Sequence, residues 1–186
     1  MNSKPSIPGF SSPAAGPEHP LERLSACHER VERQCVTLER LVAYLQTHAV
    51  DVVAADAAAA VIAYFEKAAA NHHADEEIDL FPALREAVTG GQAQALQHAL
   101  QDLERQHVDL GQQWATLHAS LQRIVQQASV ELDAHVVERF VVGYRAHMAI
   151  EESQVLPLAR QCLQENTLQQ IGLAMSRRRG LHVSLQ

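Results

Sequence analysis

Aromatic residues are scarce in this sequence, and no long apolar run is present. Phe, Trp and Tyr make up only 4% of the 186 residues, whereas Ala, Leu, Gln and Glu are plentiful, which favours helices over sheet. No apolar stretch approaches the roughly 20 residues that a transmembrane helix needs, so we expect no membrane span. The N-terminus lacks a basic start followed by an apolar segment, and no secretion signal is visible.

Cysteine and positive charge are also in short supply. Cys27, Cys35 and Cys162 are odd in number and form no C-x-x-C pair, which indicates a reduced, cytoplasmic protein. The formal net charge of -7 argues against nucleic-acid binding. Nothing in the sequence identifies a protein partner, and a homodimer is left open. What the chain does have is imidazole, since it contains 11 histidines.

The pattern of apolar residues predicts an all-α fold, an up-down-up-down four-helix bundle. Residues 1–17 are rich in Ser, Pro, Gly and Ala and should form a flexible tail. The bundle should cover residues 18–165, and a short C-terminal helix and tail should cover residues 166–186. The periodicity of about 3.6 predicts helices from Pro20 to about Leu45, then over roughly 51–88, 92–127 and 130–163, with a short fifth helix over 167–176. Arg177, Arg178 and Arg179 are expected to be a solvated end of this last helix.

Two segments repeat one spacing of titratable residues. The first reads N-H-H-A-D-E-E-I-D-L-F-P and ends at Pro82, and the second reads H-M-A-I-E-E-S-Q-V-L-P and ends at Pro157. In both, a histidine is followed four residues later by glutamate, on the same face of a helix, and ten residues later by proline. Each proline removes a backbone donor and should kink or end its helix.

Four histidines are expected at one level of the bundle. In an antiparallel helix pair, two residues lie level when the turn lies midway between them. The midpoint of His28 and His72 is residue 50, that of His72 and His107 is residues 89–90, and that of His107 and His147 is residue 127. All three midpoints fall in predicted turns, so each helix should contribute one histidine to a single layer.

Glu76 and Glu151 should lie on one side of this layer, because each follows its histidine by one turn. Four imidazoles and two carboxylates would then converge in the interior. Buried carboxylates need a strong compensating charge, which two divalent cations can supply. Each glutamate can bridge both ions while the histidines cap them. Mixed imidazole and carboxylate donors suit Fe, Mn or Zn and do not suit Ca or Mg.

These segments, with L-S-A-C-H-E-R-V-E around His28 and E-R-Q-H-V-D-L around His107, resemble the hemerythrin-like, or HHE cation-binding, domain family. The resemblance covers about residues 18–163. It implies a four-helix bundle around a non-haem di-iron centre, two iron ions (Fe2+/Fe3+) with a bridging oxo or hydroxo group, for which Mn or Zn could substitute. Carried over position by position, it implies the metal ligands His28, His72, Glu76, His107, His147 and Glu151.

One position departs from the oxygen-carrying members of that family, which have a second histidine four residues after the first on helix three. Here that position is Gly111, so one iron should lose a protein ligand and keep room for water, hydroxide or a small molecule. The roles of two further residues stay open. His73 and Glu77 form a second pair with the same spacing, turned about 100° from the first, and His73 could support the site. Glu32 is either a further ligand or a partly solvated charge.

The expected function is a di-iron protein that binds or senses a small oxidant, a diatomic ligand such as O2 or NO, or peroxide. An alternative is a di-iron oxidase or peroxidase, although such enzymes in the ferritin-like class use four carboxylates, and the imidazole-rich set favours binding over oxidation. The same residues would also suit an iron reservoir, a protein for the repair of iron centres or a regulatory protein.

Overall fold

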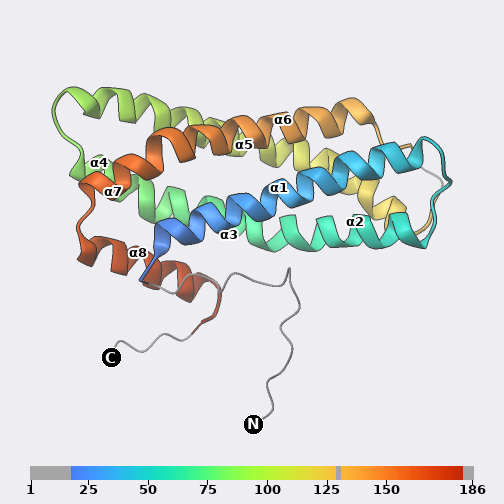
Figure 1. The fold of residues 1–186 in the computed structure, drawn as a ribbon, viewed down its shortest axis with the longest axis horizontal. Coiled ribbons are helices and arrows are strands. Elements are labelled where there is room, and N and C mark those ends of the chain that lie inside the picture. Colours follow the sequence, from blue (N-terminus) through green and yellow to red (C-terminus); the bar gives the residue numbers. More distant parts are fainter. Residues whose placement is uncertain (1–17, 129–130, 182–186) are drawn as a thin grey trace, which may run out of the picture.

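The computed structural model describes residues 18–128 and 131–181, and the predicted tail of residues 1–17 lies outside this part. Every regular element of the described residues is a helix. Four long rods lie side by side, and α8 lies at one end of them (Figure 1). The first rod is α1 (Pro20–Leu45), and the second comprises α2 (Val52–Tyr64), α3 (Ala70–Ala74) and α4 (Phe81–Ala87). The third rod is α5 (Gly91–Val125), and the fourth comprises α6 (Ala134–Ile150) and α7 (Leu156–Cys162). The last helix, α8, covers Glu165–Arg178.

Local signals in the sequence explain where the rods begin. Pro20 occupies the first turn of α1, where its missing N–H costs nothing. The side chain of Asp51 accepts a hydrogen bond from the Ala54 amide and caps α2, and Asp133 caps α6 in the same way. Between the rods the connections are short, which agrees with the helix spans that the apolar periodicity predicts.

The second and fourth rods contain π-helical turns at the motif segments. These turns are η1 (Phe65–Ala69), η2 (Asp75–Leu80) and η3 (Glu151–Val155). Pro82 and Pro157 follow η2 and η3 after one intervening residue, and the chain stays helical beyond them. Proline cannot donate to the preceding turn and its ring crowds the carbonyl four residues back, and a wider turn ahead of it relieves both problems. The sequence left open whether each proline kinks its helix or ends it. Both prolines interrupt the regular α-helix of their rods, and neither ends the rod.

The core has two apolar parts. One lies around Cys35, Leu38, Phe65, Leu117 and Phe140, and the other around Leu24, Phe81, Leu100 and Leu156. Buried polar side chains, including the six predicted ligands, separate the two parts along the rods. A polar layer of this kind inside an apolar core requires compensation from within the layer.

The helix α8 corrects one expectation. It packs against α1 and η2, and its last turn is anchored. Arg178 and Arg179 both bind Asp75, and Arg178 also binds Asp79 at 2.8 Å. The expectation of a solvated arginine end was wrong for these two residues, because a fully buried carboxylate at position 75 needs cationic partners. Only Arg177 of the three is exposed.

The described helices offer no candidate for a membrane span, since none is both long enough and apolar enough. All three cysteines are free thiols, and Cys27 and Cys35 are buried.

Candidate metal centre

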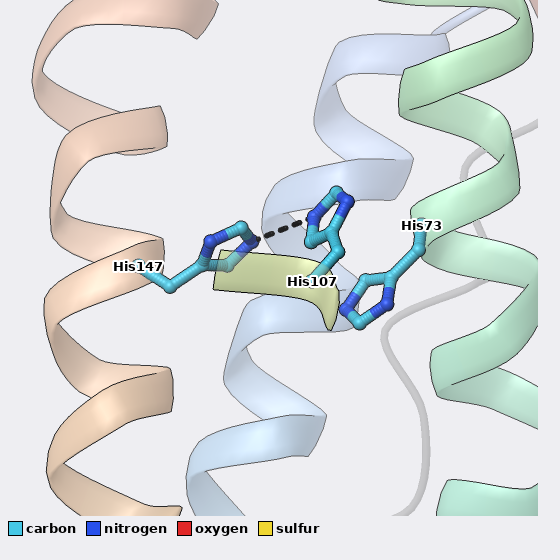
Figure 2. A group of neighbouring side chains, drawn as sticks. All are labelled: His73, His107 and His147. Atoms are coloured by element: carbon cyan, nitrogen blue, oxygen red, sulfur yellow. Dashed lines mark hydrogen bonds between the residues drawn. The ribbon is translucent and has the colours of Figure 1, made fainter. Parts of the chain in front are cut away.

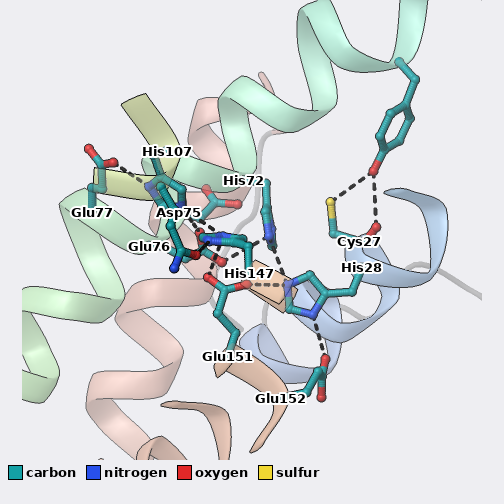
Figure 3. Close-up of polar contacts among 12 residues, drawn as sticks. Cys27, His28, His72, Asp75, Glu76, Glu77, His107, His147, Glu151 and Glu152 are labelled. Carbon is teal, nitrogen blue, oxygen red and sulfur yellow. Dashed lines mark hydrogen bonds and ion pairs between the residues drawn. The ribbon is translucent and has the colours of Figure 1, made fainter. Parts of the chain in front are cut away.

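All six predicted ligands meet in the interior of the bundle. The side chains come from α1, α3, η2, α5, α6 and η3, so each of the four rods contributes a histidine and two rods also contribute a glutamate (Figure 3). None of the six is more than 6% exposed. The single histidine level predicted from the turn midpoints is therefore present: His28, His72, His107 and His147.

The four imidazoles form two pairs. The Nε2 atoms of His28 and His72 are 3.1 Å apart, and those of His107 and His147 are also 3.1 Å apart. Each pair therefore presents two ring nitrogens to one small volume.

Each glutamate spans both imidazole pairs. One oxygen of Glu76 lies 3.1 Å from His72 Nε2, and the other lies 3.4 Å from His107 Nε2. In the same way, the oxygens of Glu151 lie 3.2 Å from His147 Nε2 and 3.0 Å from His28 Nε2. Two overlapping four-residue sets result, and both contain Glu76 and Glu151. This sharing is what carboxylates that bridge two ions require.

The outer nitrogens of three imidazoles are held by acceptors. His28 Nδ1 donates to Glu152 at 2.7 Å, His107 Nδ1 donates to Glu77 at 2.6 Å, and His147 Nδ1 donates to the amide oxygen of Gln106 at 3.0 Å. Because these acceptors require a proton on Nδ1, the hydrogen-bond network assigns the neutral rings a lone pair on Nε2. That lone pair points inward, which is the arrangement of a metal-ligating histidine.

The interior of the site holds few hydrogen-bond donors for its carboxylates. With lone pairs on the inner nitrogens of His107 and His147, that pair cannot form a hydrogen bond across its 3.1 Å contact, and the Nδ1 atom of His72 is buried without a partner. Both oxygens of Glu151 and one oxygen of Glu76 are buried without a hydrogen-bond partner, although ring nitrogens lie close to them. Orphaned buried carboxylate oxygens are costly. A pair of cations between the rings would satisfy these oxygens, so the residues present fit a dinuclear metal centre.

Burial and the neighbouring charges shift the pKa values of several site residues. Burial, and then the charge of Glu151, raise the pKa of Glu76 well above its usual range. Burial lowers the pKa of His72 to about 3 and, together with the nearby His147 ring, lowers that of His107. The rings of His72 and His107 are therefore neutral at physiological pH and can act as ligands. At His28 burial acts in the same direction, but Glu151 and Glu152 outweigh it and raise the pKa.

A second group of charges supports the site from the side of α8. Asp75 precedes Glu76 in η2 and is completely buried. Arg179 binds its carboxylate at 2.6 and 3.1 Å, and Arg23 donates to Ser176 of α8 at 2.9 Å. These contacts hold the π turn that carries Glu76 against α1 and α8.

The structure shows different surroundings for Glu32, Glu77 and His73, whose roles the sequence left open. Glu32 forms an ion pair with Arg145 at 2.7 Å and is 42% exposed, so it is the partly solvated charge. Glu77 is 42% exposed and faces the outer side of His107, so it belongs to the support of the site. His73 does lie beside the centre, with its ring stacked on that of His107.

Gly111 differs from the expectation. It is exposed, and a Cβ atom added there would meet nothing within 4 Å. The inward-facing residue of that turn is Leu110, which is 2% exposed. The glycine therefore keeps no space beside the centre, because it lies at the surface of α5.

Sequence reasoning missed Glu152, Gln106 and the metal-supporting role of Glu77. A signal for two of them was present, since both motif copies contain a Glu-Glu doublet. The first glutamate of each doublet faces inward, and the second reaches the outer nitrogen of a histidine on another rod. No comparable signal marks Gln106, which only the packing of α5 against α6 brings to His147.

Comparison with known proteins agrees with this geometry. The sequence model of the hemerythrin HHE cation binding domain matches residues 19–159. A protein of Haemophilus influenzae described as uncharacterized is 36% identical over 160 residues, which cover 86% of this chain and 90% of that protein.

Proposed function

The chain belongs to the hemerythrin HHE cation-binding family, and on that premise we propose that it holds two iron ions and binds or senses a small oxidant such as O2, NO or peroxide. Six residues would hold the ions: His28, His72, Glu76, His107, His147 and Glu151. The proposal includes the up-down-up-down order of the rods, which the short connections between successive rods support.

One observation carries the proposal. Three separate acceptors fix three histidines with their protonated nitrogens outward and their lone pairs inward. Two buried glutamates between these rings retain oxygens without any hydrogen-bond partner. A cluster that served only packing or hydrogen bonding would pair these atoms with one another, whereas a cluster that holds cations leaves them free.

Each residue has a separate task in this proposal. Glu76 and Glu151 would neutralise the charge of both ions, since each already reaches both imidazole pairs. Glu77 and Glu152 accept hydrogen bonds from the outer N–H groups of His107 and His28, which makes these two rings better electron donors to a metal. When bound, a pair of iron ions supplies redox-active positions at which a small oxidant can bind.

The surroundings of the centre are unequal. On one side, Phe65, Phe140 and Tyr144 form a dry aromatic block, with ring centroids 5.0 to 5.4 Å apart. A shallow surface groove between α1 and the fourth rod is lined by His28, Glu152, Glu32, Arg145 and Met148, among others. The groove brings solvent to the edge of a site ligand and is the entry that we propose for a diatomic molecule or peroxide.

The donor set favours binding over oxidation chemistry. Two carboxylates face at least four imidazoles here, whereas ferritin-like oxidases surround their metals with four carboxylates. Fewer negative charges stabilise highly oxidised iron less well. We therefore propose a binding or sensing role, with no substrate turnover required.

Metal analysis of anaerobically purified protein tests the proposal, followed by optical spectra on addition of O2 and of NO. We expect about two iron ions per chain and a spectral change with each gas. Glu76→Ala and Glu151→Ala should each lose most of the metal, because each removes a shared ligand. Glu86→Ala, an exposed position on the same rod as Glu76, is the matched control. Protein that takes up no iron on anaerobic reconstitution would refute the proposal.

A further inference from the structure

The second histidine of the His-His doublet is not used by the six-residue set. His73 lies on α3 beside His72, but its ring is directed to a different part of the centre. The ring stacks on that of His107, with centroids 3.9 Å apart and planes 13° apart. It also lies 5.9 Å from the His147 ring (Figure 2). His73 therefore borders the imidazole pair that α5 and α6 provide.

The inner nitrogen of His73 has no partner. Its Nε2 atom is buried and makes no hydrogen bond. One nitrogen from each of His73, His107 and His147 lies within 4.8 Å of the other two. Ligand atoms of one ion lie about 3 to 4 Å apart when each metal–nitrogen bond is about 2.1 Å long. Because an imidazole lone pair lies in the plane of its ring, the His73 ring must also turn out of its stack on His107 to bind an ion shared with His107 and His147.

The position of the second rod explains how two consecutive residues reach the same centre. In a regular α-helix, neighbours point about 100° apart. The short α3 lies between η1 and η2, which widen the rod on both sides of the doublet. The second rod packs between α1 and α5. As a result His72 meets His28 of α1, and His73 meets His107 of α5.

We propose that His73 is a third imidazole ligand of the metal position bordered by His107 and His147. This inference rests on the proposed function, since it adds a ligand to the same centre. The third imidazole would then come from His73 on the second rod. Position 111 on the third rod, where oxygen-carrying relatives have a histidine, is glycine in this chain.

His73→Phe tests the inference, because phenylalanine keeps an aromatic ring against His107 and removes the ligand nitrogen. The matched control is His118→Phe, which alters a histidine of α5 that pairs with Glu66 at 3.0 Å, away from the six-residue set. Each protein is titrated anaerobically with Fe(II) against a competing chelator, and circular dichroism of the metal-free protein checks folding. His73→Gln, with a polar side chain in place of the ring, is the second variant if His73→Phe does not fold.

We expect the native protein and the control to bind two Fe(II) ions. In His73→Phe one binding step should weaken tenfold or more while the other changes little, since only one ion loses a ligand. Native affinity for both ions would overturn the inference and leave His73 a packing residue, and so would an equal loss at both steps. A native protein that binds no Fe(II) would refute the proposed function itself, so the two failures are distinguishable.

Discussion

The contact between Asp75 and the last turn of α8 allows a quantitative test of how the fold supports the centre. Asp75 is 0% exposed, whereas Arg178 and Arg179, which bind it, are 19% and 23% exposed. Replacing both arginines by alanine leaves a buried carboxylate without its partners. Such a change costs about 3 to 5 kcal/mol. We expect about 3 kcal/mol, because Arg23 remains nearby as a cation and the lost pairs are partly solvated.

The decisive variant adds Asp75→Asn to the double replacement. On its own, Asp75→Asn should cost about 1 to 2 kcal/mol, because it weakens charged hydrogen bonds while Arg178 keeps Asp79. In the absence of both arginines, the same change removes an unpaired buried charge. It should then restore about 1 kcal/mol, a reversal of sign that a double-mutant cycle detects.

Urea unfolding of metal-free protein, followed by circular dichroism, measures these free energies. For a chain of this size, a loss of about 3 kcal/mol corresponds to a fall of about 6 to 12 °C in the melting temperature. Arg177→Ala, at an exposed position of the same helix, is the control and should change little. The reasoning is refuted if the double replacement costs less than about 0.5 kcal/mol, or if Asp75→Asn lowers stability equally with and without the arginines.

Three further predictions concern the centre. Glu77→Ala should weaken metal binding about 10- to 100-fold by releasing the outer nitrogen of His107; chelator competition measures this, and native affinity would contradict it. Chelation of the metal should lower the melting temperature clearly, because metal binding contributes to folding; an unchanged melting curve of verified metal-free protein would argue against a metal in the core. Metal-free protein should lose stability as the pH falls below about 6.5. In the folded protein the pKa values of His72 and His73 are lowered to about 3 and 2, so these rings stay neutral, whereas in the unfolded chain the same rings take up protons. Between about pH 7.5 and 5.5, His73→Gln should make the loss in free energy of unfolding smaller by about 1 kcal/mol, as measured by urea unfolding. An unaltered pH dependence would contradict a buried, neutral His73 ring.

The sequence alone was sufficient for the helices and for the six residues that converge. Apolar periodicity and turn residues predicted the rods within a few residues, because helix periodicity is a local property. The repeated spacing of His, Glu and Pro identified the pairs on the second and fourth rods. The midpoints between the histidines then placed His28 and His107 at the same level, since short turns leave little freedom in how neighbouring rods align.

The tertiary structure alone decided which groups surround those six. Glu152 lies beside His28 although 124 residues separate them, and Arg178 reaches Asp75 across 103 residues. The Glu-Glu doublet marked Glu152 but not its partner, and the contact of Arg178 has no local signature, because an exposed helix end and an anchored one have the same composition. The surroundings of His73 likewise depended on the packing of the second rod between α1 and α5. Residue spacing sets the face of a regular helix, but departures from that helix and contacts between distant segments arise only when the whole chain packs.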